Sequence, residues 1–271
     1  MYSFGPLPRQ KRTGRHLGTH QKVDRIARRH LTKYLSPALN FPSIKEIIHF
    51  EGSRGPDGIK LKSPGRDEPF HFIDPSNPEG ELLEHVRAHS KNLTKALVEN
   101  DQTRAAFEAS WLAHTVADGL TPAHHESMQQ QTKHMKHSET TSKVRGKVVM
   151  GGATAKEIVQ NNWQFWGAKG IMTNHTLFEA GIAVAAKPYK FKSGMPFEHD
   201  IESLEQEGYE HLYVRLVTEV AALGMYDKFK KLGWTNELAR QTNKELLPRV
   251  VMAITLAWYD AYRKALKEVK A

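Results

Sequence analysis

Three histidines and one aspartate fall within the fourteen-residue stretch LAHTVADGLTPAHH, residues 112–125. Phe107, Trp111, His114 and Asp118 follow one another at steps of four, three and four, which predicts one face of a helix. Because two large aromatic residues begin this face, we expect it to point into the core. A buried carboxylate is costly unless it is paired or binds a metal ion. The stretch therefore predicts a partner for Asp118.

The turn after this helix brings another histidine to the same place. Thr121 is a good N-cap and Pro122 suits the first position of a helix. We therefore expect a new helix whose first turn presents His124 close to His114 and Asp118. A lone HxxxD pattern is more typical of an ordinary core or surface pair, but HxxxD followed by xxxPxH is far more restrictive.

A second pair has the same helical spacing. His175 and Glu179 lie four residues apart in NHTLFEAGIAV, so one divalent ion can take both side chains as ligands. The alternative is an ordinary hydrogen bond on a helix surface. Upstream, Asp57 in PDG and His71 in HFIDP add two candidate ligands, although aspartate beside glycine or proline is also common in turns. We expect His71, flanked by two phenylalanines, to point into the core.

The elements that must position these residues are almost all helical. Asp101 is the expected N-cap of the helix that carries His114. Residues 51–78, rich in proline and glycine, predict a long loop, and KVRGKVVM is the one weak strand candidate. We predict an all-α fold, with an irregular basic arm at residues 1–19 and a single domain over residues 20–271. Helical spacing predicts helices at residues 21–36, 43–50, 79–100, 101–120, 154–166, 174–186, 200–231 and 235–270.

Composition limits the kinds of site and partner. The chain has 271 residues, no cysteine and a net charge of +9. Without cysteine there are no disulfides or zinc–thiolate sites, so nitrogen and oxygen must hold any metal. A transmembrane run and a secretory signal are both absent, which predicts a cytoplasmic protein, or a secreted one if the N-terminus is incomplete. The positive charge favours a polyanionic partner such as nucleic acid or anionic phospholipid, although a merely basic surface is equally compatible.

In order and spacing, these residues resemble the superfamily of bacterial zinc-dependent phospholipases C and fungal single-strand-specific nucleases. The family's signature is HxxxD, then xxxPxH, then a later HxxxE or HxxxD. An earlier aspartate precedes the histidine of an HFIDP-like run, and the first histidine often follows Gly-Thr. The family is all-α and holds three zinc ions at the bottom of a cleft. The matching residues here are His20, Asp57, His71, His114, Asp118, His124, His175 and Glu179.

The resemblance covers residues 20–179 and implies how the ligands divide between ions. One zinc is expected at Asp57, His71, His114 and Asp118. A second zinc is expected at His124, His175 and Glu179. The resemblance further implies that Asp118 bridges to a third zinc, bound by His20.

Two features depart from the family pattern. Family members begin with a tryptophan that binds the third zinc, but no tryptophan precedes Trp111 here. We therefore predict two zinc ions and leave the third open. His16, four residues before His20, is a candidate replacement, or an incidental histidine of the arm. The segment 126–152 is longer than in the secreted phospholipases and is either a cap or flap over the metals or a solvated loop.

The resemblance implies a zinc-dependent phosphodiester hydrolase that attacks with a metal-bound hydroxide. Asp118 would join two ions, and Asp57 would also orient the nucleophile. The substrate is expected to be phospholipid or single-stranded nucleic acid. The positive charge favours nucleic acid, as would a stacking platform at Trp163, Phe165 and Trp166, although we expect these aromatics in the core. No apolar surface loop for a lipid is evident.

The alternative function is a non-catalytic one. The chain would then be a zinc-stabilised scaffold or a basic nucleic-acid-binding module. The oligomeric state is not predicted.

Overall fold

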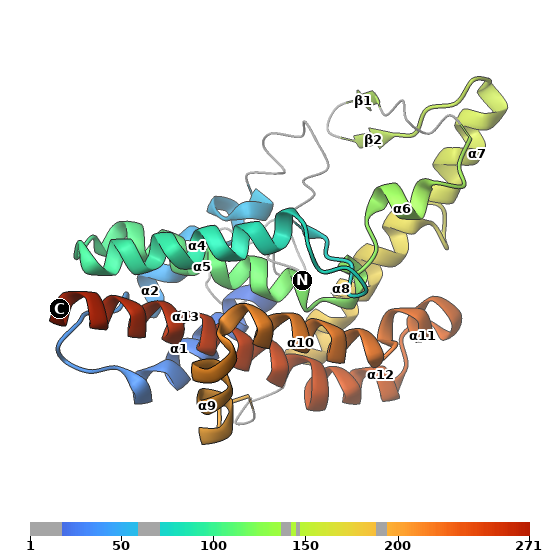
Figure 1. The fold of residues 1–271 in the computed structure, drawn as a ribbon. Helices are drawn as coiled ribbons and strands as arrows, with labels where there is room; N and C mark the ends of the chain where they lie inside the picture. The colour runs from blue at the N-terminus through green and yellow to red at the C-terminus, as the bar shows by residue number, and fades with distance from the viewer. Residues whose placement is uncertain (1–17, 59–70, 137–141, 145–146, 188–193) are drawn as a thin grey trace.

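The computed structural model describes residues 18–58, 71–136, 142–144, 147–187 and 194–271 (Figure 1). The described chain is all-α apart from one short hairpin, which confirms the predicted fold class. Its helices up to η5 are α1 (Thr19–Leu31), η1 (Thr32–Tyr34), α2 (Ile44–Ile47), η2 (Ile48–Phe50), η3 (Gly52–Arg54), α4 (Glu81–Val98), α5 (Gln102–Gly119) and η5 (Pro122–His124). The later elements are α6 (Met128–Thr132), β1 (Ser142–Val144), β2 (Lys147–Val149), α7 (Ala155–Trp166), α8 (Ile171–Ala186), α9 (Glu198–Glu207), α10 (Tyr209–Ala222), α11 (Met225–Leu232), α12 (Asn236–Gln241), the π-helical turn η6 (Thr242–Leu246) and α13 (Leu247–Lys270).

Helix ends follow the expected capping chemistry. The Asp101 side chain accepts a hydrogen bond from the Arg104 backbone at 2.9 Å, which confirms it as the N-cap of α5. Thr154 caps α7 in the same way. The predicted arm at residues 1–19 lies outside the described residues except for its last two, and Thr19 already begins α1.

Three elements differ from the prediction. Residues 200–231 form three helices instead of one, because Gly208 and Gly224 adopt positive φ angles of 81° and 61° and end the helices there. The turn after α5 is the single 3₁₀ turn η5, and the Thr121 hydroxyl donates to the Ala117 carbonyl instead of capping it. The π-helical turn η6 interrupts the predicted helix at residues 235–270.

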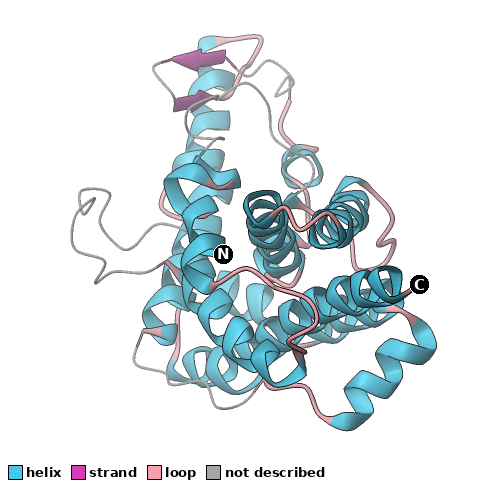
Figure 2. Cartoon of the chain, turned by 90° about the vertical axis from the view of Figure 1, so that its left-hand side faces the viewer, coloured by secondary structure: helices cyan, strands magenta, loops and turns pink. Residues whose placement is uncertain are grey.

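The weak strand candidate forms a real hairpin. Ser142 pairs with Val149 and Val144 with Lys147, so β1 and β2 are antiparallel. Figure 2 shows this hairpin at one end of the molecule, beyond the main group of helices. Segment 126–152, predicted as either a cap or flap or a solvated loop, thus contributes the only sheet among the described residues.

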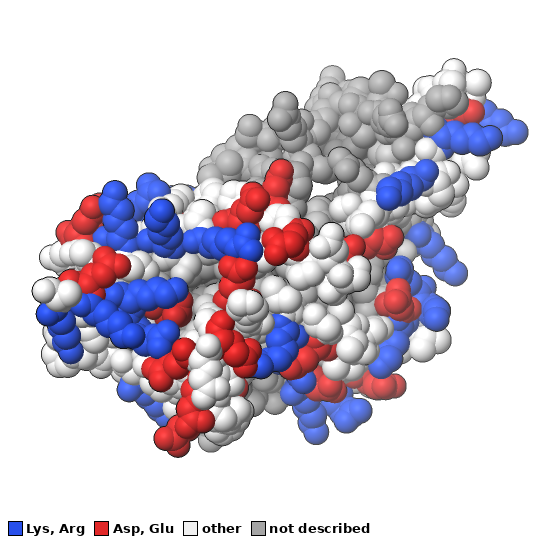
Figure 3. Space-filling model, viewed as in Figure 1, with Lys and Arg blue, Asp and Glu red and all other residues white. Residues whose placement is uncertain are grey.

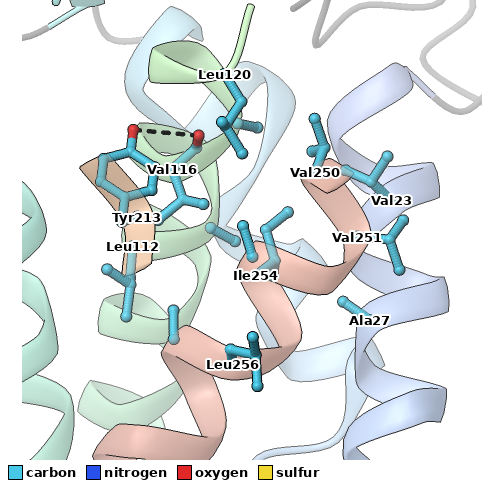
Figure 4. Close-up of a cluster of buried hydrophobic side chains, with 14 of the residues drawn as sticks. Val23, Ala27, Leu112, Val116, Leu120, Tyr213, Val250, Val251, Ile254 and Leu256 are labelled. Atoms are coloured by element: carbon cyan, nitrogen blue, oxygen red, sulfur yellow. Dashed lines mark hydrogen bonds between the residues drawn. The ribbon is translucent and has the colours of Figure 1, made fainter. Parts of the chain in front are cut away.

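The core is organised around α13, which packs against α1, α4, α5 and α10. Trp258 on α13 is fully buried and donates its indole N–H to the Ala109 carbonyl on α5 at 2.9 Å. In Figure 4, Ile254 of α13 lies among side chains of α1 and α5, and the Tyr213 hydroxyl of α10 donates to the Val116 carbonyl at 3.4 Å. These contacts hold the histidine-bearing end of α5 against the rest of the bundle.

Helix α8, which carries His175 and Glu179, is held from both sides. Lys22 of α1 donates to the carbonyls of Ala186 and Lys187 at the end of α8, the latter at 3.0 Å. On the other side, the Phe178 ring contacts an aromatic cluster formed by Tyr226, Phe229 and Trp234. Across the described residues, the helices are all too short or too polar to cross a membrane.

Candidate metal centre

The candidate ligands come from segments far apart in the sequence. His20 lies in the first turn of α1, and His114 and Asp118 occupy the last turns of α5. His124 lies in η5, which follows α5 directly. The chain near His71 is tied to that turn by a hydrogen bond from the Ile73 N–H to the His124 carbonyl at 3.0 Å.

Asp118 is the residue on which these segments converge. One of its carboxylate oxygens, Oδ2, lies 2.6 Å from Nδ1 of His71 and 3.3 Å from Nε2 of His114. The other, Oδ1, lies 3.4 Å from Nε2 of His20 and 3.7 Å from Nδ1 of His124. All five side chains are buried. The predicted partner of Asp118 is therefore a set of four imidazoles, two on each oxygen.

Four of the five imidazoles in the centre, those of His20, His114, His124 and His175, are stacked in two pairs. His20 and His114 have ring centroids 4.1 Å apart with an interplanar angle of 7°. His124 and His175 have centroids 4.9 Å apart with an angle of 9°. Glu179 closes the second pair, since its Oε1 lies 3.0 Å from Nε2 of His124 and 3.6 Å from Nε2 of His175.

Three groups of side chains can each hold a metal ion, because their ligand atoms lie within 4.8 Å of one another. Two of these groups match the ligand sets predicted for the first and second zinc ions, except that Asp118 is not in the first group. The third group joins His20 and His114 to Glu51, which was not predicted as a ligand. His16 lies outside the described residues. The groups are Asp57, His71 and His114; His124, His175 and Glu179; and His20, Glu51 and His114.

Charges within the centre are strongly coupled. Burial alone would lower the pKa of His114, but the carboxylates of Asp118 and Glu51 outweigh it and raise that pKa well above its ordinary value. Burial would raise the pKa of Glu179, yet positive groups that include His175 and His124 hold it well below its ordinary value. Burial lowers the pKa of His124 to about 4. Glu179 is therefore ionised and His124 neutral, the states in which these side chains bind a cation, whereas the raised pKa of His114 reflects the buried carboxylates beside it, whose charge a cation would balance.

The donor set fits a divalent cation. Nε2 of His114 and Nδ1 of His124 are buried and make no hydrogen bond with the described residues, although each faces Asp118. Buried polar atoms of this kind need a partner, and a cation between imidazole and carboxylate would provide one. Nitrogen and oxygen donors without sulfur suit zinc and similar borderline ions. Asp57 differs from the rest in that 27% of its side chain is exposed.

Two acidic residues near the centre, Glu51 and Asp24, were not predicted from the sequence. Glu51 precedes η3 and places Oε1 3.0 Å from Nδ1 of His114. Asp24 is fully buried on α1, and neither of its carboxylate oxygens makes a hydrogen bond with the described residues. Burial and the charge of Glu51 raise the pKa of Asp24 well above its ordinary value. His20 and Asp24 have the same i, i+4 spacing as the two pairs already singled out, so that spacing was a usable signal for Asp24.

Phe72 lies between the centre and residues of segment 126–152 and α7. The Phe72 ring lies 5.6 Å from that of His124 and 6.5 Å from that of His175. It also packs against a small cluster of buried residues made by Met135, Met150 and Phe165. Met135 and Met150 of segment 126–152, together with Phe165 of α7, therefore pack with the ring that contacts His124 and His175.

The aromatic residues of α7 are only partly in the core. Phe165 is buried as expected, but Trp163 and Trp166 are exposed, so the expectation for these two was wrong. Helical spacing predicted the helix correctly, but within the described ranges its outer face is not covered by another helix.

No family model, no curated protein and no solved structure matches this chain.

Proposed function

We propose that this protein is a zinc-dependent hydrolase of phosphodiester bonds. The observation that supports it most is the position of Asp118, whose two carboxylate oxygens each face a different pair of imidazoles. A carboxylate in this position is suited to join two cations. Paired cations about 3.5–4 Å apart are common in phosphodiester hydrolases.

In this proposal the chain's residues divide the work. Asp57, His71, His114 and Asp118 would hold one ion, and His124, His175 and Glu179 would hold another. His20 extends the centre on the Oδ1 side of Asp118, where a third ion would bind. Cations bound here supply a water of lowered pKa and neutralise charge on the phosphate oxygens.

Asp57 has a second role in the proposed reaction. Its carboxylate lies 3.7 Å from Nε2 of His114 and is partly exposed, whereas the other ligands are almost fully buried. It can therefore reach a group that arrives from solvent. We assign it the orientation of the nucleophile by accepting a hydrogen bond.

Turnover of bis(p-nitrophenyl) phosphate tests the proposal. Hydrolysis should require zinc and fall more than about a hundredfold in Asp118→Asn, which removes the charge that joins the ions. Asp227→Asn is the matched control, because Asp227 is an exposed carboxylate on α11 and pairs only with Lys230 among the described residues. A wild-type protein that binds zinc but cleaves nothing would instead support the scaffold alternative. Comparison of phosphatidylcholine with single-stranded DNA would then identify the substrate class.

A further inference from the structure

The outer face of α7 carries an exposed apolar stripe. Nine large apolar side chains are exposed among the described residues, and four of them lie on this one helix: Ile158, Val159, Trp163 and Trp166. Val159 and Trp163 are 70% and 72% exposed and one helical turn apart, and Trp166 continues the same face. Exposed apolar surface that is gathered on one element marks an interaction site more often than scattered residues do.

The inner face of α7 is attached to the protein by few groups. Its buried residues are Asn161 and Phe165. The Asn161 side chain donates to the carbonyls of Lys136 and Gly151 at 2.9 and 2.7 Å. Phe165 packs into the small cluster that includes Phe72. The exposed stripe thus lies on the face of α7 away from Phe165, which packs with Phe72, and the Phe72 ring lies near those of His124 and His175.

The charge around the stripe is positive. Residues 127–170 contain seven Lys and Arg against two Glu, or +5 of the net +9 of the chain (7 − 2 = 5). Among the described residues of this segment, four lysines are exposed: Lys133, Lys136, Lys156 and Lys169. Glu157, the one acid described there, accepts a hydrogen bond from the Ala153 N–H at 2.8 Å. Figure 3 shows Lys and Arg side chains with few acidic ones at the α7 end of the molecule.

We propose that α7 docks this protein on an anionic phospholipid surface. A helix with an aliphatic and tryptophan stripe and flanking lysines lies in the plane of a bilayer interface, with its apolar face among the acyl chains. Tryptophan is enriched at that depth, and lysines near an anionic surface add electrostatic attraction to it.

The composition of the stripe distinguishes this partner from nucleic acid. Stacking on bases needs aromatic faces, and Ile158 and Val159 would contribute nothing to it. Both would be buried at a lipid interface. The docking itself does not depend on hydrolysis. We further infer that docking brings lipid headgroups to the His124–His175–Glu179 group, and this step rests on the proposed function.

Vesicle co-sedimentation tests the docking. The protein should bind phosphatidylcholine vesicles that contain phosphatidylserine, and more weakly at high salt or with phosphatidylcholine alone. Val159→Ser/Trp163→Ala should weaken binding by about tenfold or more, because it removes most of the exposed apolar stripe. Phe197→Ala/Leu232→Ala is the matched control, since both side chains are equally exposed but lie on other elements, and it should bind like the wild type.

Hydrolysis of soluble bis(p-nitrophenyl) phosphate separates the two proposals. The Val159→Ser/Trp163→Ala variant should cleave this substrate within about twofold of the wild-type rate, since both side chains point mostly to solvent and neither belongs to a ligand group. If the wild type binds anionic vesicles but neither it nor the variant hydrolyses the substrate, the hydrolase proposal is wrong and the docking proposal stands. The docking proposal is overturned if the wild type ignores anionic vesicles, or if the variant loses only oligo(dT) binding or only self-association.

Discussion

Oε1 of Glu51 lies 3.0 Å from Nδ1 of His114, on the side of the ring opposite Asp57 and Asp118. An imidazole that binds a metal through one nitrogen usually donates its other N–H to a carboxylate. Although Glu51 is also near enough to His20 to be a ligand itself, we favour the orienting role because it contacts Nδ1 of His114, while the other ring nitrogen, Nε2, faces Asp57 and Asp118.

Glu51→Gln tests that role. The amide oxygen can still accept from His114 but lacks the charge, so zinc affinity should fall about 10–100-fold while the fold is retained. Isothermal titration with zinc measures the change. Glu99→Gln, at an exposed position on the α4 boundary, should leave the affinity unchanged. A loss of one whole zinc equivalent in Glu51→Gln would mean that Glu51 is a ligand.

His114 and His175 should each be needed for one ion, in different ligand groups. Nε2 of His114 faces Asp57 and Asp118, while its Nδ1 contacts Glu51, so one nitrogen is left for a metal. His114→Ala and His175→Ala should therefore each lose about one metal equivalent, and the double variant about two. Metal analysis after dialysis counts the ions, with His211→Ala as an exposed control. A double variant that loses no more metal than either single variant would contradict two separate groups.

Removal of metal should lower thermal stability. Asp118 and Glu51 are buried carboxylates whose charge a cation would balance, and a ligand that binds the folded state alone stabilises it. Zinc at about 1,000 times its Kd would contribute ~4 kcal/mol. At ~2–4 °C per kcal/mol, EDTA should then lower Tm by about 10 °C. Calorimetry checks this, and an unchanged Tm would argue against a metal in the folded protein.

Gly119, directly after Asp118, is required by the packing of α10. A Cβ at this position would overlap the Tyr213 hydroxyl and lie 3.0 Å from Cδ2 of Leu82. Gly119→Ala should therefore destabilise the protein by ~1–3 kcal/mol. Adding Tyr213→Phe removes the overlapping oxygen, so the double variant should recover part of the loss. Additive effects of the two changes in urea unfolding would show that the steric explanation is wrong.

His30 should make stability depend on pH. Its ring lies 3.3 Å from the Gly194 carbonyl, and burial lowers its pKa below the ordinary value, with further contributions from Lys33 and Arg29. Because the unfolded chain then binds this proton more readily, the contribution of His30 is lost as pH falls below ~6.5.

The stability difference between the wild type and His30→Gln should accordingly narrow from about pH 8 to about pH 5. His211→Gln is the control, because that ring also bonds a backbone carbonyl but is exposed. Comparing each variant with the wild type at the same pH cancels the effect of the other histidines. A constant difference for His30→Gln would contradict the pKa shift.

Much of this protein could be predicted from local sequence. The helices and the cap at Asp101 depend on spacing and on residues within a few positions of one another. The pairs His114–Asp118 and His175–Glu179 share helix faces for the same reason. Breaks at Gly208 and Gly224 were missed because a glycine within a helical pattern does not reveal its φ angle.

Only the tertiary structure decided what those faces meet. The packing of α1 and α5 against α13, and of α8 against α1 and η5, brings the histidines together. It also places Glu51 against His114 from a segment with no metal-binding pattern. The same packing leaves Trp163 exposed on α7. Periodicity shows which residues share a face but not which element covers it, because that depends on contacts between residues distant in the chain.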